Sequence, residues 1–224
     1  MKAHPLPDPA PTPPLRVATK AEAVYDELRT RILDGTLEPG SVLNQEVLAA
    51  GLGLSITPLR EALRRLEVEG LVRLKAHSTM AIAPLTLKEL TELYAVRTTL
   101  DPVAAGLAAA QATDAQLKEI ARLAAERPDR SPRGRLLANR RFHRAVYSAC
   151  GNLVLTQLLD QLWDRTDRYR LIVVRERTYG AVAMRDHREI AAALLRRDAI
   201  AVSTLVRQHV ETTRHMIERL TNVF

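Results

Sequence analysis

The sequence lacks several features that particular classes of protein require. It contains one cysteine, Cys150, so an internal disulfide is impossible and a reducing, cytoplasmic environment is expected. No apolar run reaches the length of about eighteen residues that a membrane-spanning helix needs. The first 14 residues also lack the basic-then-apolar order of a secretory signal. With 46% hydrophobic and 26% charged residues, the composition indicates an ordinary globular protein without membrane contact.

Excess charge of either sign is missing from the N-terminal third of the chain. The net charge is +7, but residues 1–84 contain ten Lys or Arg and ten Asp or Glu. The whole excess therefore lies in residues 85–224. A basic balance often indicates a nucleic-acid partner. Here that inference has to rest on local pattern in the N-terminal part and not on total charge.

Residues 1–17 contain few side chains that could form a core. Six of the twelve prolines lie within residues 1–14. Such a segment cannot bury enough apolar surface to offset the entropy lost on ordering. We therefore expect a disordered, proline-rich tail at 1–17.

Residues 18–84 show three short helical patterns followed by an alternating segment. A first helix begins near residue 18 and ends at Gly35, and a second covers about 44–50 with Val47 and Leu48 facing inward. The third has Thr57 as its expected N-cap and Pro58 at its first helical position. Alternation over 71–82 predicts a β-hairpin. This order is that of a winged helix-turn-helix.

The segment around the third helix carries a specific motif. It reads LGLSITPLREALRRLEVEGLV over residues 52–72, and LEPG precedes it at 37–40. The combination of turn glycines, Thr-Pro and the closing Glu-Gly-Leu-Val resembles the GntR superfamily of winged-helix transcription regulators. The resemblance covers most of residues 21–84 and implies sequence-specific binding to double-stranded operator DNA.

The third helix offers the groups that such binding needs. Hydroxyls, free backbone N–H groups and a guanidinium at its N-terminal end can enter a major groove. The expected DNA-contacting residues are Ser55, Ile56, Thr57, Arg60, Arg64, Arg65 and, at the wing tip, His77 and Ser78. The alternative is that the three arginines form an ordinary solvated face. The surrounding motif favours DNA contact.

Two positions depart from the family pattern. Ile56 stands where the family usually has arginine, which removes a strong guanine or phosphate contact, although Ile56 could touch a thymine methyl group. In the wing, Thr79 replaces a usual glycine and Ser78 a frequent basic residue. These departures put the base preference in question.

Residues 85–224 read as helix throughout. Capping patterns begin helices at Thr86 and Thr113. Further helices are expected at about 134–149, 152–177, 181–197 and 199–221. The fold class is therefore mainly α, with a winged helix-turn-helix at 18–84 and an all-helical bundle of about six helices at 85–224.

The bundle resembles the helical ligand-binding domain of the FadR branch, the FCD type. The residues that carry the resemblance are Tyr94-Ala95-Val96-Arg97, Leu100-Asp101-Pro102, Asn139-Arg140-Arg141-Phe142-His143, Gly151-Asn152, Asp186-His187, Asp198-Ala199 and His209. Many members of the family bind a divalent metal through one aspartate and three histidines. The histidine positions are His143, His187 and His209. The aspartate position is Asn139, one turn before His143, which offers only a neutral carbonyl oxygen.

Three imidazoles suit zinc, with nickel, cobalt and manganese as alternatives. Each histidine taken singly would more often be a core residue with one hydrogen bond. The family spacing favours a metal, and the neutral amide of Asn139 predicts a weakened or lost site.

The resemblance also implies a cationic anchor for an effector carboxylate. Arg97 is the first candidate, and Arg165 and Arg168 are weaker ones. The alternative for Arg97 is an ion pair with Asp101.

The sequence thus predicts a cytoplasmic, homodimeric repressor. Its operator binding is expected to respond to a small organic acid held in the bundle. One alternative keeps the DNA-binding part and makes the bundle a metal-free ligand pocket or a dimerisation module. A remote alternative is an enzyme that activates water at a metal. The chain shows no general base beside the histidines, no nucleophile motif and no phosphate loop. We therefore expect no enzymatic activity.

Overall fold

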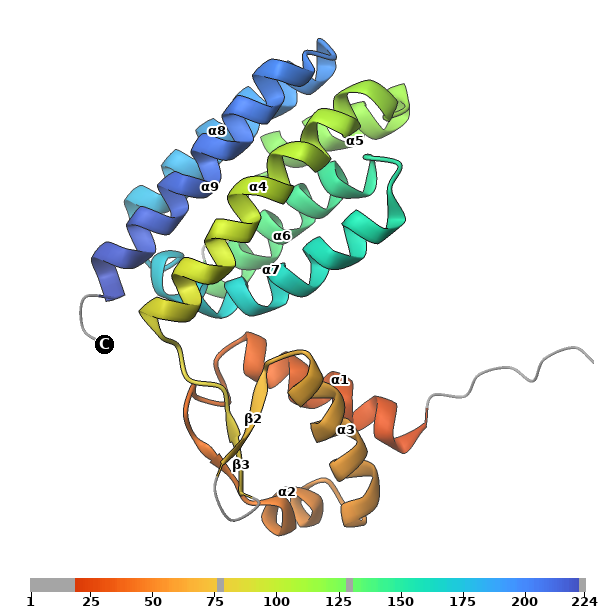
Figure 1. Ribbon diagram of the computed structural model, residues 1–224, viewed down its shortest axis with the longest axis vertical. Coiled ribbons are helices and arrows are strands. Elements are labelled where there is room, and N and C mark those ends of the chain that lie inside the picture. Colours follow the sequence, from red (N-terminus) through yellow and green to blue (C-terminus); the bar gives the residue numbers. More distant parts are fainter. Residues whose placement is uncertain (1–18, 76–78, 128–130, 222–224) are drawn as a thin grey trace, which may run out of the picture.

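The protein forms two helical units, one above the other in Figure 1. The computed structural model describes residues 19–75, 79–127 and 131–221. The tail predicted to be disordered lies outside this part. Within it, each unit has its own hydrophobic core, one built by residues 24–82 and the other by residues 90–217.

The N-terminal unit contains three helices and a small sheet. In chain order they are α1 (Lys20–Leu33), β1 (Val42–Leu43), α2 (Gln45–Gly51), α3 (Ile56–Val68), β2 (Val72–Lys75) and β3 (Thr79–Ile82). Thr19 and Glu22 close a capping box at the start of α1. Past its end, Gly35 adopts φ of +80°, a conformation that glycine reaches without steric cost. The winged-helix order is confirmed.

The sheet has one more strand than the sequence predicts. β3 lies between β1 and β2, and both pairings are antiparallel, with Ala81 opposite Val42 on one side and Arg73 on the other. β2 and β3 are the predicted hairpin. The two-residue β1 is too short to show any alternation in sequence.

Two expectations about α2 and α3 are wrong in detail. The N-cap of α3 is Ser55 and not Thr57, and Pro58 is the third helical residue and not the first. Proline is still tolerated there because N–H groups of the first turn have no partner within the helix. In α2, Val47 is 66% exposed and Ala49 is the buried residue, whereas Leu48 packs against the core as expected.

The upper unit is a bundle of six helices among the described residues, as predicted. They are α4 (Leu87–Gln111), α5 (Asp114–Ala125), α6 (Pro132–Ser148), α7 (Leu153–Val173), α8 (Arg177–Leu195) and α9 (Ala199–Thr221). α4 and α9 lie side by side in Figure 1 and pack along much of their length. Small residues allow this approach, because a Cβ at Gly106 would lie only 2.7 Å from Ser203 Oγ.

α7 joins the bundle to the N-terminal unit. Asp164 forms an ion pair with Arg29 of α1, and Arg168 donates to the carbonyl of Ala83. Leu171, one turn further, lies where a side chain at Gly35 would contact it at 3.4 Å. The spacing 164, 168 and 171 places these contacts on one face of the helix.

Among the described helices, none combines the length and the apolar character that crossing a membrane requires.

Candidate nucleic-acid interface and histidine centre

The N-terminal end of α3 is exposed while its opposite face forms the core. Leu59, Leu63 and Leu66 are fully buried. Ser55, Thr57, Arg60, Arg64 and Arg65 are exposed, and Ile56 is half-buried. Five of the six predicted contact residues are therefore accessible. Ser55, Thr57 and Arg60 lie at the N-terminal end of α3, and Arg64 and Arg65 lie further along it, with Arg65 in the last turn. The wing residues His77 and Ser78 lie outside the described part.

Two of the three arginines already have contacts within the unit. The Nε of Arg60 donates to Gln45 Oε1 at 3.2 Å, and the Arg65 guanidinium lies 4.0 Å from the centre of the Tyr25 ring. Tyr25 in turn donates to Glu69 at 2.7 Å. Burial, together with this bond to Glu69, raises the pKa of Tyr25 to about 12. Arg65 is thus held close to the surface by a neutral ring, whereas Arg60 reaches outward beside α2.

The three histidines meet inside the bundle. They come from α6, α8 and α9, and all three are at least nine-tenths buried. His143 Nε2 lies 3.2 Å from His209 Nε2 and 3.1 Å from His187 Nε2. Ligands about 2.0–2.1 Å from one zinc ion are separated by similar distances. The convergence that the family spacing implied is present in the structure.

The pKa of each of the three imidazoles is lowered, which favours the neutral form that a metal requires. Burial, with the charges of the neighbouring histidines and of Arg170, moves the pKa of His143 and of His187 well below 6.5. Burial also lowers the pKa of His209, against the opposing effect of Asp186. A neutral imidazole keeps its lone pair available for coordination.

Groups behind the histidines orient two of the rings. Asp186 Oδ2 lies 3.1 Å from His209 Nδ1, and Tyr147 Oη lies 3.3 Å from His143 Nδ1. Tyr147 itself donates to Asp101 at 2.8 Å. Carboxylates behind ligating histidines fix the ring orientation and raise ligand basicity. The sequence motifs included Asp101 and Asp186 but gave no indication of these roles, which depend on packing between helices.

Asn139 lies one turn before His143 and has no partner for its amide. The residue is buried, and neither Oδ1 nor Nδ2 forms a hydrogen bond within the described part of the chain. A buried unpaired amide costs free energy unless a ligand satisfies it. The orphaned oxygen and the three neutral imidazoles together fit a divalent metal. Asn139, His143, His187 and His209 would hold it.

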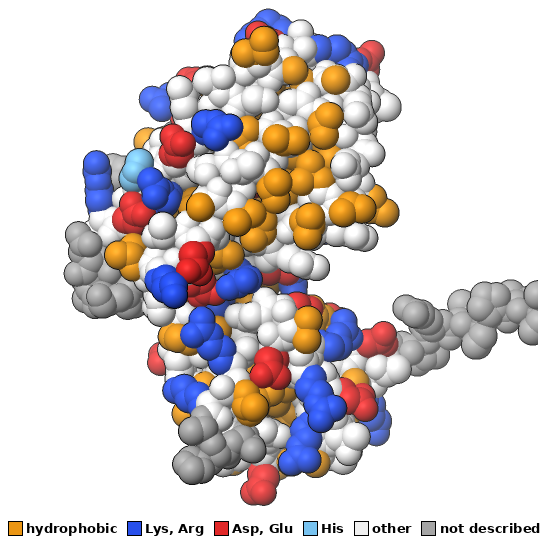
Figure 2. Space-filling view, viewed as in Figure 1, with side chains coloured by type: hydrophobic (Ala, Val, Ile, Leu, Met, Phe, Trp, Pro, Cys, Tyr) orange, Lys and Arg blue, Asp and Glu red, His pale blue; other side chains and the backbone are white. Residues whose placement is uncertain are grey.

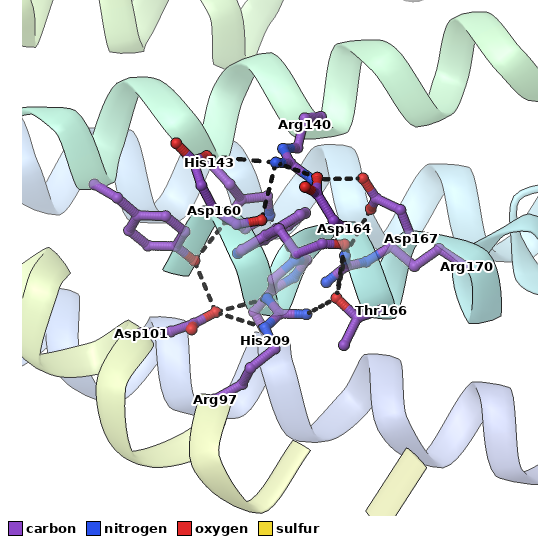
Figure 3. Close-up of polar contacts among 12 residues, drawn as sticks. Arg97, Asp101, Arg140, His143, Asp160, Asp164, Thr166, Asp167, Arg170 and His209 are labelled. Atoms are coloured by element: carbon purple, nitrogen blue, oxygen red, sulfur yellow. Dashed lines mark hydrogen bonds and ion pairs between the residues drawn. The ribbon is translucent and has the colours of Figure 1, made fainter. Parts of the chain in front are cut away.

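The three arginines expected to anchor an effector are engaged elsewhere. Arg97 is fully buried and donates twice to Asp101 Oδ2, at 3.2 and 2.6 Å, which is the ion pair weighed as its alternative (Figure 3). Arg165 pairs with Glu89 at 2.5 Å and lies against Gly70. Arg168 faces the N-terminal unit through Ala83. None of the three lines the cavity beside the histidines.

Arg97 stacks on the Trp163 ring together with Arg170, an arrangement that the sequence does not reveal. Its guanidinium lies 4.2 Å from the Trp163 ring, and that of Arg170 lies 3.7 Å from it. The Trp163 ring centre is 4.6 Å from that of His143. Trp163 is therefore a core residue, and it connects α7 to the histidine centre.

An exposed α3 on a winged-helix unit, joined to a bundle with buried histidines, defines a DNA-binding transcription regulator. Comparison with known proteins agrees. Residues 20–82 match the model of bacterial regulatory proteins of the gntR family, and residues 92–212 match the FCD domain. The chain belongs to the GntR family of transcription regulators with an FCD domain.

Relatives extend along both units. The transcriptional repressor GlaR of Escherichia coli is 28% identical over 207 residues, covering 87% of this chain and 94% of GlaR. The gluconate operon repressor of Bacillus licheniformis is 39% identical over 84 residues, covering 38% of this chain and 34% of that protein. The structure of E. coli McbR/YncC superposes with a TM-score of 0.74 at 22% identity, over 92% of this chain and all of that one. The family and these relatives are regulators and not enzymes.

Proposed function

We propose that the protein is a homodimeric repressor of the cytoplasm whose operator binding is modulated by a small molecule bound beside a metal in the helical bundle. The DNA-binding domain comprises residues 18–84, and the helical domain comprises residues 85–224. The single observation that carries the proposal is the convergence of three neutral, buried imidazoles next to an unpaired amide. A bundle that served only for dimerisation would not require such a centre.

The proposed DNA contacts use the exposed end of α3. Ser55 and Thr57 supply hydroxyls beside the free N–H groups of the first turn, and Arg60 supplies a guanidinium that can bridge two acceptors of guanine. Arg64 and Arg65, a turn further on, suit phosphates. Ile56, in place of the family's arginine, suits a thymine methyl group. His77 and Ser78 remain proposed wing contacts.

The proposed metal ligands are the three histidines and, more weakly, Asn139. Zinc would suit this set, since zinc takes imidazole nitrogens and oxygen as ligands. When bound, the ion would supply a Lewis acid. His187 and Asn139 also line the cavity between α5, α6 and α8, so a small molecule there would lie beside the proposed ligands.

The proposed dimer forms through the exposed apolar side chains of α4 and the start of α7. Val96 and Val103 are 44% and 51% exposed, and Leu153, Val154 and Leu158 of α7 are also exposed. Figure 2 shows hydrophobic side chains gathered on this side of the bundle. The two helices that carry these residues, α4 and α7, pack against each other. Large exposed apolar patches mark interfaces, and a two-fold dimer would pair two α3 helices for a pseudo-palindromic site.

The proposed coupling between ligand and DNA runs through α7. Trp163 contacts His143 on one side of this helix, while Asp164 and Arg168 contact the N-terminal unit on the other. Ligand binding can shift the DNA-binding units only if the two arrangements bind the ligand with different affinity. A ligand that moves α6 or Trp163 acts on the same helix that positions α1.

Fluorescence anisotropy with the duplex that flanks its own gene tests the proposal. A scrambled duplex at the same salt concentration is the control, because non-specific binding falls steeply with salt. We expect tight binding to the native duplex alone, and weaker binding when small carboxylates are added. Equal binding to both duplexes would contradict sequence-specific regulation at that site. Unchanged binding with every ligand, with and without chelator, would favour a purely dimerising bundle.

A further inference from the structure

Arg60 of α3 is held by a hydrogen bond to the neighbouring helix of the DNA-binding unit. Its Nε donates to Oε1 of Gln45, the first residue of α2, at 3.2 Å. The two helices pack against each other and lie at the lower end of the molecule in Figure 1. Arg60 is exposed and Gln45 is half-buried. The bond therefore ties the exposed guanidinium to a less exposed side chain.

The contact uses the N–H group on Nε and leaves the end of the guanidinium free. Among the described residues, neither Nη1 nor Nη2 of Arg60 has a hydrogen-bond partner. Guanine presents the acceptors O6 and N7 to the major groove, and two parallel N–H groups of an arginine match them. With Nε occupied, Nη1 and Nη2 are the pair that remains for a base edge.

The bond to Gln45 also restricts how the guanidinium can turn. An arginine side chain loses rotamer freedom when it docks on a base, and this loss weakens binding. A planar group held at Nε has less freedom about its last side-chain bonds, so part of the loss has already occurred in the free protein. Gln45 thus prepares Arg60 for one orientation in the groove.

Gln45 orients the arginine without neutralising it. The glutamine oxygen is a neutral acceptor, and in the described part of the chain no carboxylate forms an ion pair with Arg60. The acids beside the two residues in sequence, Glu46 and Glu61, are exposed. Arg60 therefore keeps its positive charge for a polyanionic partner, whereas a carboxylate at position 45 would partly cancel it.

The other two arginines of α3 are placed differently. Arg65 lies in the last turn, with its guanidinium 4.0 Å from the centre of the Tyr25 ring. A ring face attracts the cation but accepts no specific N–H group in the plane of the guanidinium. Arg64 is exposed and forms no hydrogen bond or ion pair with the described residues. Within that part of the chain, Arg60 is thus the arginine of α3 that a hydrogen bond orients.

We infer that Gln45 is a specificity-determining residue of the DNA-binding unit, because it holds Arg60 so that Nη1 and Nη2 face a guanine in the major groove. Gln45 acts through Arg60 and is a positioning residue. This inference rests on the proposed function, since it names a second residue on which base selection by Arg60 depends. Loss of Gln45 should alter the choice of base at one position and leave the attraction to phosphates intact.

The test begins with selection of duplexes from a random library by the full-length protein. Anisotropy with single-base variants of the selected site then gives the preference at each position. Arg60→Ala identifies the guanine that Arg60 reads, because the preference at that position is lost. In Gln45→Met, which has no acceptor oxygen, this preference should fall about threefold to tenfold. The preferences at the other positions should remain.

Three further measurements separate positioning from other roles. The slope of log affinity against log salt should be unchanged in Gln45→Met, since no charge is removed. Gln45→Glu keeps an acceptor, so it should retain the base preference while binding every duplex more weakly. In the Arg60→Ala background, adding Gln45→Met should change the base preference no further. Gln208→Met, at an exposed glutamine of α9, is the matched control and should behave as the parent does.

The inference is wrong if Gln45→Met keeps the guanine preference of the parent, and the proposed function then still stands. Equal weakening at every base, with a lower free energy of unfolding in urea, would overturn it in favour of a purely structural bond between α2 and α3. A further loss of preference in the double variant would mean that Gln45 reads a base itself. A library from which the parent selects no sequence would contradict this inference and the proposed function together.

Discussion

Asp164 of α7 and Arg29 of α1 form an ion pair across the contact between the bundle and the N-terminal unit. The same carboxyl group forms an ion pair with Arg140 of α6 at 2.8 Å. Arg140 follows Asn139 directly, so the helix that carries two proposed ligands of the metal also carries one partner of Asp164. A displacement of α6 would therefore act on the residue that holds α1.

The energetic link between these residues can be measured with a double-mutant cycle. Arg29→Met and Asp164→Asn should each lower the free energy of unfolding by about 1–2 kcal/mol, since both groups are largely removed from water. The double variant should show a coupling energy of about 0.5–3 kcal/mol in urea unfolding. Additive effects would mean that the pair contributes nothing to holding the two units together.

Arg60 is the residue of α3 whose loss should affect specificity most. We expect Arg60→Ala to weaken binding to the native duplex by roughly tenfold to a hundredfold and to affect the scrambled duplex much less. Arg122→Ala, an exposed arginine of the bundle, serves as the control for lost charge. Retained specific binding by Arg60→Ala, measured by anisotropy, would contradict the assignment of this end of α3.

Restoring the carboxylate at position 139 should strengthen the metal site. Asn139→Asp gives the three imidazoles a charged oxygen ligand, and affinity for zinc should rise by about tenfold or more. Competition with a chromophoric chelator measures this affinity, and His187→Ala should reduce it. His215→Ala is the control, because His215 is exposed and separate from the cluster. Equal zinc affinity in Asn139→Asp and the parent would show that residue 139 is not a ligand.

The stability of the metal-free protein should fall as the pH decreases below about 6.5. Burial lowers the pKa of His143, His187 and His209, so the folded state resists protonation while the unfolded chain takes up protons. The contribution of these histidines to the free energy of unfolding is thus fully present above the pKa that histidine has in the unfolded chain. Below that pH it decreases, by up to about 1.4 kcal/mol per pH unit for each histidine. Thermal unfolding in chelator from pH 8 to 5 checks this. His187→Leu should flatten the profile, and an equal slope in this variant would count against the explanation.

The proposed dimer surface predicts the effect of a charge in its centre. Val103→Glu places a carboxylate on the exposed apolar side of α4 and should shift the protein towards monomers. Light scattering after size-exclusion chromatography gives the mass. Val68→Glu is the control, since Val68 is 90% exposed but belongs to α3. An unchanged dimer in Val103→Glu would place the interface elsewhere.

The sequence predicted those parts of the fold that local chemistry determines. The stripe of Leu59, Leu63 and Leu66 gives α3, and the pair Thr113 and Gln116 forms the capping box that begins α5. The three histidines were found because a family pattern fixes their spacing. Their meeting point required only that three helices turn the expected faces inward.

Features that depend on contacts between distant segments were not predictable from local pattern. β1 exists because it pairs with Met80 and Ala81, about forty residues away, and its two residues carry no signal of their own. Arg165 and Arg168 were predicted as ligand anchors, but Arg165 pairs with Glu89 of α4 and lies against Gly70, and Arg168 donates to the carbonyl of Ala83. Tyr179 has no distinctive local motif, and only the packing of α5, α6 and α8 places it in one cavity with Asn139 and His187.

The two-sided contacts of α7 limit how this protein can be recombined with its relatives. A chimera that joins a foreign N-terminal unit to this bundle replaces the partners of Asp164, Arg168 and Leu171 but keeps Trp163 and the histidines. If the proposed coupling runs through α7, such a hybrid should bind its ligand and its DNA independently, without communication between them. A responsive biosensor made from these parts would need the outward face of α7 to be exchanged together with the new DNA-binding unit.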